Sequence, residues 1–296
     1  MNVARPSRFG VGNAEWRIPQ RSRIARSAQR PLTTLANLLR VVLAGAWTGI
    51  VGMPLIVFVY IRYFWGQLVA LLGRRDLLDR ALEGNAWLAG WVAQRLWSPV
   101  LLAITGIQLR VREAVPIDWN RAHVICSNHA SVFDILAIVR AVPPPFRFVA
   151  KRELVKWPII GWVLPPAGQI IVDRGNRTGA LRTIAEASAR HIRGQVIFFV
   201  EGTRTRTGDL LPFKKGAFHF ATENHLAILP TAIAGSYGAL AKAPWWQLHP
   251  GRQIEVSFLA PILPSEQPHE HDDGTAVEAL LSLTRERIAA SLAASS

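Results

Sequence analysis

A histidine and an aspartate five residues apart, His129 and Asp134, have the side chains and the spacing for acid–base chemistry. An apolar run at 122–126 precedes them, and a second apolar run at 135–139 follows. The first run is typical of a buried strand and the second of a helix, and catalytic groups gather at such strand ends in α/β proteins. Because five residues turn about 500° in a continuous helix, the pair can meet only if His129 lies in the turn before the helix and Asp134 in its first turns.

The aspartate of this pair has two candidate roles. Near the amino end of a helix the helix dipole keeps a carboxylate ionised. Asp134 would then hold the His129 imidazole in one tautomer and stabilise its protonated form, as the acid of a Ser-His-Asp triad does. A serine nucleophile is unnecessary if the substrate brings its own hydroxyl. The alternative role is structural, because Ser131 and Asp134 have the spacing of a capping box.

Basic residues follow two further predicted strands. The segment 201–204, Glu-Gly-Thr-Arg, comes directly after the apolar run 196–200, and Arg174 follows the run 168–172. Glycine permits a tight turn at a strand end, and arginine grips a phosphate with two parallel hydrogen bonds. Each segment alone is consistent with a solvated loop. Together with His129 they describe a group that activates a hydroxyl beside a phosphate-binding cluster.

The remaining candidates for reactive or metal-binding side chains favour structural interpretations. Cys126 is the single cysteine, which excludes an intrachain disulfide and any site with several thiolates. A nucleophilic pair of Cys126 with His129 is one interpretation, and a small buried strand residue is the ordinary one. The cluster at 269–273, His-Glu-His-Asp-Asp, resembles a metal site but stands in a polar, proline-rich linker. We therefore predict an exposed loop there and no metal.

The composition combines high hydrophobicity with a strong positive charge. Half of the 296 residues are hydrophobic, and the formal net charge is +14. Together these values favour an anionic membrane surface as a partner, although the charge alone would also suit a nucleic acid. Residues 1–40 contain eight arginines and one acidic residue, Glu15. This composition fits a disordered basic tail, an organelle transit peptide or, as we prefer, a tail that contacts anionic lipid.

An uncharged segment follows the basic tail. Residues 41–61 would form a helix of about 31 Å, which matches the ~30 Å hydrocarbon core of a bilayer. A second apolar run, 63–73, follows Arg62, and basic residues flank both runs, so the charges indicate no clear sidedness. Two interpretations are open: a single span, or two helices that enter one leaflet and return. Gly45 and Gly49 have the Gly-x-x-x-Gly spacing of closely packed helices.

From about residue 107 the pattern changes to alternating strands and helices, which predicts an α/β domain with a largely central sheet. The predicted strands are 122–126, 147–150, 169–172, 196–200, 229–233 and 253–259. Helices are predicted at 76–104, 178–193 and 275–292. We therefore divide the chain into a basic tail (1–40), membrane-associated helices (41–105) and an α/β domain (106–296).

Four segments, in this order, resemble the sequence blocks of the glycerolipid acyltransferase family, in particular its bacterial 1-acylglycerol-3-phosphate acyltransferases. The segment 129–134 matches the family's His-x4-Asp block, and 201–204 matches its Glu-Gly-Thr-Arg block. The segment 168–174 resembles the block that ends in a phosphate-binding arginine, and 228–233 resembles a strand that contains proline. The resemblance covers about residues 100–265, and one departure is Val200, where many members have proline.

The resemblance implies a sheet flanked by helices, an amino-terminal membrane-embedded helical segment and an acyltransferase activity in phospholipid biosynthesis. An acyl chain would move from acyl-CoA or acyl carrier protein to the free hydroxyl of a lysophospholipid, foremost 1-acyl-sn-glycerol-3-phosphate, which gives phosphatidic acid. His129 would take the proton of that hydroxyl, and Asp134 would orient His129. The implied substrate-binding residues are Lys151, Arg174, Glu201, Gly202, Thr203 and Arg204.

This reaction requires no bound cofactor, no metal and no nucleic-acid partner, and the resemblance implies the inner membrane with the catalytic domain on the cytoplasmic side. Two alternatives stay within the enzyme class: another lysolipid, such as a lyso-ornithine lipid, or glycerol-3-phosphate as the acceptor. A third alternative, from a different class, is a non-catalytic membrane protein that binds anionic lipid through its arginines. Turnover of a thioester with a lysolipid separates this third alternative from the others.

Overall fold

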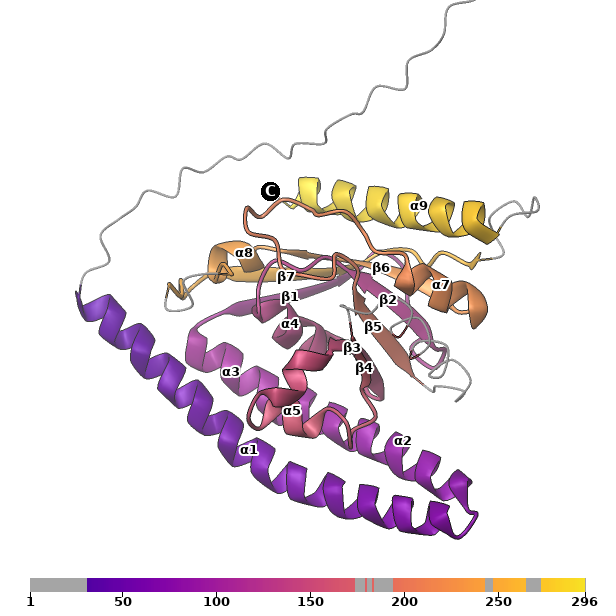
Figure 1. Ribbon diagram of the computed structural model, residues 1–296. Coiled ribbons are helices and arrows are strands. Elements are labelled where there is room, and N and C mark those ends of the chain that lie inside the picture. Colours follow the sequence, from indigo (N-terminus) through magenta and orange to yellow (C-terminus); the bar gives the residue numbers. More distant parts are fainter. Residues whose placement is uncertain are drawn as a thin grey trace, which may run out of the picture.

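The computed structural model describes residues 31–173, 194–242, 247–264 and 273–295, together with residues 179 and 183. A seven-stranded sheet with the order β1-β7-β6-β2-β5-β3-β4 lies at its centre (Figure 1). Neighbouring strands are parallel except for β6 and β7, which confirms the predicted α/β class. The strands are β1 (Gln108–Glu113), β2 (His123–Ser127), β3 (Phe146–Lys151), β4 (Ile170–Val172), β5 (Gln195–Phe199), β6 (Ala227–Ala234) and β7 (Gln253–Phe258).

The central strands match the predicted apolar runs, whereas β1 was not among them. Every residue of β2 is buried, which explains why its sequence reads as a continuous apolar run rather than an alternating one. β1 lies at the edge of the sheet and is mostly exposed, so it lacks the buried face that produces a recognisable pattern. Charge pairing supports it instead, because Arg112 Nε lies 3.1 Å from Glu255 Oε2 on β7.

Helices cover both faces of the sheet (Figure 1). On one face lie α7 (Gly216–Glu223) and α9 (Asp273–Ala294), which is the predicted closing helix. On the other face lie α3 (Ser98–Thr105) and α4 (Phe133–Ala141). The predicted helix at 178–193 lies almost entirely outside the described residues.

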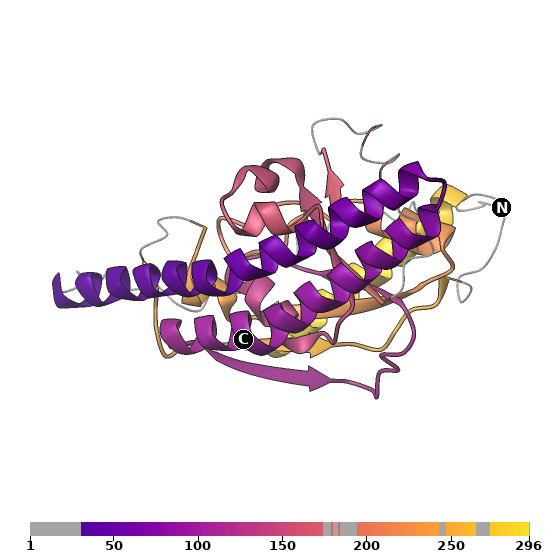
Figure 2. The same ribbon diagram turned by 90° about the horizontal axis from the view of Figure 1, so that it is seen from below.

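Two long helices form a hairpin along one side of the molecule (Figure 2). They are α1 (Pro31–Leu71) and α2 (Arg75–Val92), and a π-helical turn (Ala93–Trp97) leads from α2 into α3. α1 is long and apolar enough to cross a membrane between Thr33 and Leu71. Large apolar side chains are exposed along it, among them Leu35, Leu39, Ile50, Ile61, Trp65 and Leu71. This exposed apolar surface indicates association with a membrane.

The inward side of α1 packs against the α/β domain. The buried Asn37 donates from Nδ2 to the carbonyl of Leu248 at 2.8 Å. The predicted pair, Gly45 and Gly49, is not closely packed: a Cβ on Gly45 would meet nothing within 4 Å, and one on Gly49 would make an ordinary contact at 3.8 Å from Ile159 Cδ1. Close packing occurs at Gly52 instead, where a Cβ would overlap Ile159 Cγ2. Ile159 lies between a 3-10 turn (Arg152–Lys156) and α5 (Ile160–Val163), in the connection from β3 to β4. The glycine thus allows this connection to approach the helix.

Candidate active site

The sheet topology brings the predicted blocks to one edge. Because β2, β5, β3 and β4 are parallel neighbours, their carboxyl ends lie side by side. His129 follows β2, Glu201 follows β5, and Lys151 ends β3. Arg174, the predicted phosphate-binding residue after β4, lies outside the described residues.

His129 and Asp134 meet as their spacing requires. His129 precedes α4 and Asp134 lies in its first turn, with His129 Nδ1 2.8 Å from Asp134 Oδ2. The Asp134 side chain is fully buried, while the His129 side chain is 14% exposed. Asp134 Oδ2 also accepts the backbone N–H groups of Ala130 at 2.7 Å and Ser131 at 2.8 Å. One carboxylate oxygen therefore both caps the turn and contacts the imidazole, so the two roles considered for Asp134 are compatible.

An aromatic stack fixes the plane of the imidazole. The ring of His129 is stacked on Phe199, with centroids 4.0 Å apart and planes 15° from parallel. Phe199 is in turn stacked on Phe148 of β3 at 6.1 Å and 23°. No sequence pattern indicated a role for these two rings beside His129, because an aromatic side chain in a buried strand resembles an ordinary core residue.

The turn that carries His129 is also attached to β6. Asn128 donates from Nδ2 to the carbonyl of Ile233 at 3.0 Å, and its Oδ1 accepts the N–H of Ile233 at 2.8 Å. Through this side chain, the hydrogen bonding between β2 and β6 extends one residue beyond the end of β2. The strand that contains proline in the sequence is this same β6, and the carbonyl of Pro230 accepts the N–H of Leu259 at 2.9 Å.

Glu201 joins the His129 turn to the loop that follows β5. Its Oε1 accepts the N–H of His129 at 2.7 Å, and its Oε2 accepts the N–H of Leu211 at 2.9 Å. Gly202 has φ 73°, a conformation that favours glycine and turns the chain directly after Glu201. The N–H of Thr205 then donates to the carbonyl of His129 at 3.0 Å. Two hydrogen bonds therefore hold the segment 201–205 against the backbone of the candidate base, and a third ties Glu201 to Leu211 farther along the loop.

Burial raises the pKa of the Glu201 carboxyl to about 7, and the nearby Asp134 adds to this shift, while the two backbone N–H groups oppose it. Between the usual value of 4.5 and about 7, the folded protein holds a proton that the unfolded chain releases. The contribution of Glu201 to the free energy of unfolding is therefore greatest below pH 4.5. It decreases by about 3 kcal/mol as the pH rises through 7.

Thermal unfolding of the detergent-purified protein at about pH 5 to 8 measures this effect. We expect the stability of the wild type to fall with pH more steeply than that of Glu201→Gln, which does not titrate. Identical slopes in the two proteins would show that Glu201 keeps its ordinary pKa.

The cationic side chains of the site differ in their surroundings. The half-buried guanidinium of Arg204 forms no hydrogen bond or ion pair with the described residues. Lys151 lies at the same sheet edge, but its exposed ammonium is 2.9 Å from Glu153 Oε1. Thr203 is exposed, and its Oγ1 accepts a hydrogen bond from Lys242 at 3.1 Å. Of the two predicted cations that the structure describes, Lys151 and Arg204, Arg204 is thus the one whose charge is not engaged by a described residue.

The other candidates from the sequence lie apart from this arrangement. Cys126 is fully buried in β2, and burial raises the pKa of its thiol far above the usual range, which opposes formation of a thiolate. Most of the cluster at 269–273 lies outside the described residues. Among the described residues, no group of three or more His, Cys, Asp or Glu is placed to hold a metal ion.

Known proteins resemble this chain over the same region. Residues 107–234 match the acyltransferase family model. The 1-acyl-sn-glycerol-3-phosphate acyltransferase of Cocos nucifera is 34% identical over 185 residues, which cover 62% of this chain and 57% of the relative. The enzyme of the same name from Escherichia coli K12 is 33% identical over 165 residues, covering 55% and 65%. The chain thus spans roughly three fifths of the length of these relatives.

The fold has a counterpart among solved structures. The crystal structure of the 1-acyl-sn-glycerophosphate acyltransferase PlsC from Thermotoga maritima superposes with a TM-score of 0.50 at 23% identity. The superposition covers 81% of this chain and 97% of that protein. It supports the fold, while the sequence matches support the family. Residues 107–234 match the acyltransferase family model, and the chain is similar in sequence to 1-acyl-sn-glycerol-3-phosphate acyltransferases.

Proposed function

We propose that this chain is a membrane-associated acyltransferase that converts 1-acyl-sn-glycerol-3-phosphate and an acyl thioester into phosphatidic acid and a free thiol. The observation that carries the proposal is the contact of 2.8 Å between His129 Nδ1 and the buried Asp134 Oδ2. With its proton on Nδ1, the imidazole keeps the lone pair on Nε2. Nε2 is then the base.

The reaction follows from this arrangement. Nε2 of His129 takes the proton of the acceptor hydroxyl while the oxygen attacks the thioester carbonyl carbon. The tetrahedral intermediate collapses, the carbon–sulfur bond breaks, and the thiolate receives the proton from the imidazolium. Asp134 stabilises the imidazolium by its charge and keeps the ring in place. Proton transfer by such a base contributes about 10²- to 10⁴-fold in rate.

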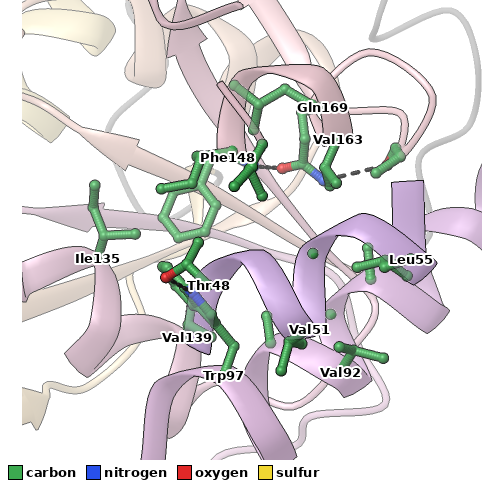
Figure 3. Close-up of a pocket in the computed structure, with 18 of the residues that line it drawn as sticks. Thr48, Val51, Leu55, Val92, Trp97, Ile135, Val139, Phe148, Val163 and Gln169 are labelled. Carbon is green, nitrogen blue, oxygen red and sulfur yellow. Dashed lines mark hydrogen bonds between the residues drawn. The ribbon is translucent and has the colours of Figure 1, made fainter. Parts of the chain in front are cut away.

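An apolar cavity beside the site suits the acyl chain of a substrate. Its volume is about 150 Å³, and its lining comes from α1, α2, α4, β3 and α5 (Figure 3). The polar groups in the lining are already bonded: Trp97 Nε1 donates to Thr48 Oγ1 at 3.1 Å, and Gln169 Oε1 accepts the N–H of Phe148 at 2.8 Å. Phe148 lines the cavity and stacks on Phe199, which stacks on His129. These rings connect the apolar space to the base.

The unpaired guanidinium of Arg204 suits the acceptor phosphate. Arginine binds a phosphate through two parallel hydrogen bonds, and lysine cannot reproduce that geometry. We expect Arg204→Lys to raise the KM for the lysophosphatidate acceptor about tenfold, with a kcat within about threefold of the wild type. Initial rates at saturating thioester measure both constants.

The matched control for this variant is Arg206→Lys, which changes an exposed arginine of the same loop. It should leave both constants unchanged. An unaltered KM in Arg204→Lys, together with a lower unfolding temperature, would show that Arg204 stabilises the loop and does not bind the phosphate.

We further propose that the chain acts at the cytoplasmic side of the inner membrane, with acyl-CoA or acyl carrier protein as donor. Both donors are cytoplasmic thioesters. The net charge of +14 favours an anionic lipid surface, and the exposed apolar side chains of α1 favour insertion into that surface. Lys151 and Arg174 would assist Arg204 in holding the acceptor, and Gly202 and Thr203 would shape the loop.

A panel of acceptors tests the function directly. Purified protein in mixed micelles receives one acyl-CoA and, in separate reactions, lysophosphatidate, glycerol-3-phosphate or a lyso-ornithine lipid, and thiol release is followed. We expect turnover with lysophosphatidate. Turnover with another acceptor alone would reassign the substrate, and the absence of turnover with all of them, in folded protein that still binds anionic vesicles, would favour the non-catalytic alternative.

A further inference from the structure

The segment that follows β6 contacts both halves of the candidate site. Gly235, with φ 80°, turns the chain from β6 into the short helix α8 (Ser236–Ala239). On the side of the base, Ser131 Oγ donates to the carbonyl of Leu240 at 2.6 Å. This bond adds to the pair that joins Asn128 to Ile233. The turn that carries His129 is therefore fixed at two points to the segment 233–240.

The same segment also holds the loop that carries Arg204. Tyr237 donates from its hydroxyl to the carbonyl of Arg206 at 2.9 Å. Lys242 donates from Nζ to Thr203 Oγ1 at 3.1 Å and to the carbonyl of Arg204 at 3.3 Å. The distance between His129 and the loop that carries Arg204 is therefore set partly by the segment 233–242, which contacts both.

We propose that Lys242 is a positioning residue for the acceptor phosphate. Its ammonium fixes the side chain of Thr203 and the backbone of Arg204, and so directs the guanidinium of Arg204, while its own charge raises the positive potential of the loop. The inference rests on the proposed function. Lys242 lies beyond residues 107–234, the region that matches the family model.

The hydrogen-bonding capacity of Lys242 supports a second role, in binding the phosphate, besides holding the loop in place. An ammonium group has three N–H donors, and the contacts with Thr203 and Arg204 occupy two of them. The third donor has no partner among the described residues. Charge-assisted hydrogen bonds to a phosphate are stronger than those between neutral groups, so loss of this ammonium weakens the binding of the acceptor selectively.

The test compares Lys242→Met, which keeps the length of the side chain but removes its charge, with Lys242→Arg, which keeps the charge. The KM values for lysophosphatidate and for acyl-CoA are measured separately, together with kcat and the unfolding temperature. We expect Lys242→Met to raise the KM for lysophosphatidate about tenfold and to leave the KM for acyl-CoA and the unfolding temperature unchanged. Lys242→Arg should restore most of the lost affinity.

Lys215→Met is the control, because it removes a lysine whose ammonium lies 2.7 Å from Glu278 on α9, away from the loop. It should leave both KM values unchanged. If Lys242→Met has wild-type constants, or if both KM values rise together with a loss of stability, the positioning role is wrong and the proposed function stands. If the wild-type protein turns over no lysophosphatidate, the proposed function and this inference both fail.

Discussion

Replacing His129 by alanine is expected to leave a folded protein whose acyl transfer is about 10²- to 10⁴-fold slower. The fold should survive, because the imidazole is partly exposed and Asp134 Oδ2 keeps the backbone N–H groups of Ala130 and Ser131. The backbone N–H of His129, which donates to Glu201, is also retained. Activity should fall because, in the proposed mechanism, Nε2 accepts the proton of the acceptor hydroxyl.

Thiol release at saturating lysophosphatidate and acyl-CoA measures the rate, and thermal unfolding verifies the fold. His219→Ala is the matched control, because His219 lies on α7, on the face of the sheet opposite α4, and should leave the rate unchanged. Transfer at the wild-type rate by folded His129→Ala would exclude the proposed mechanism.

Removal of the Asp134 side chain is expected to have the largest effect on stability. In Asp134→Ala the buried N–H groups of Ala130 and Ser131 lose their acceptor, and an unsatisfied buried donor costs about 1–3 kcal/mol. We therefore expect a loss of several kcal/mol in the free energy of unfolding, measured with denaturant. The rate should fall at least as far as in His129→Ala, because the imidazole loses both its orientation and its counter-charge.

Asp134→Asn separates the geometry from the charge. A single oxygen, Oδ2, receives all the donors, and the other oxygen, Oδ1, has no partner among the described residues. An asparagine can therefore place its carbonyl at the position of Oδ2 and keep these hydrogen bonds. We expect a loss of about 1–3 kcal/mol in the free energy of unfolding, smaller than in Asp134→Ala, because the Nδ2–H groups at the buried position of Oδ1 have no acceptor among the described residues. The rate should be about tenfold to a hundredfold lower. A rate equal to that of the wild type would show that the negative charge is unnecessary.

The sequence predicted the part of this site that depends on local spacing. The separation of His129 and Asp134 required a turn followed by a helix, and the apolar runs identified the strands that precede the basic loops. Their convergence could be expected because parallel strands share a carboxyl edge. The family resemblance supplied the reaction, since spacing alone was equally consistent with a capped helix.

The unpredicted residues act through contacts that join distant parts of the chain. Lys242 lies 38 residues from Arg204 in the sequence, and no periodicity indicates their hydrogen bond. Phe199 is indistinguishable from a core residue until its ring is seen against His129. Glu201 is predicted from the resemblance to bind substrate, and spacing gave no indication that both its oxygens accept backbone N–H groups. Such pairings depend on which strands become neighbours.

One helix, α1, presents large apolar side chains to its surroundings and also supplies Thr48, Val51 and Leu55 to the wall of the apolar cavity. A substitution that shifts or tilts this helix to suit a thicker or thinner bilayer therefore also moves one wall of the space for the acyl chain. Selection for residence in a given membrane and selection for the lipids made there thus act on two sides of the same helix. The preferred membrane and the preferred acyl chain are therefore expected to change together through substitutions in α1, whereas the residues at the carboxyl edge of the sheet are not expected to change with them.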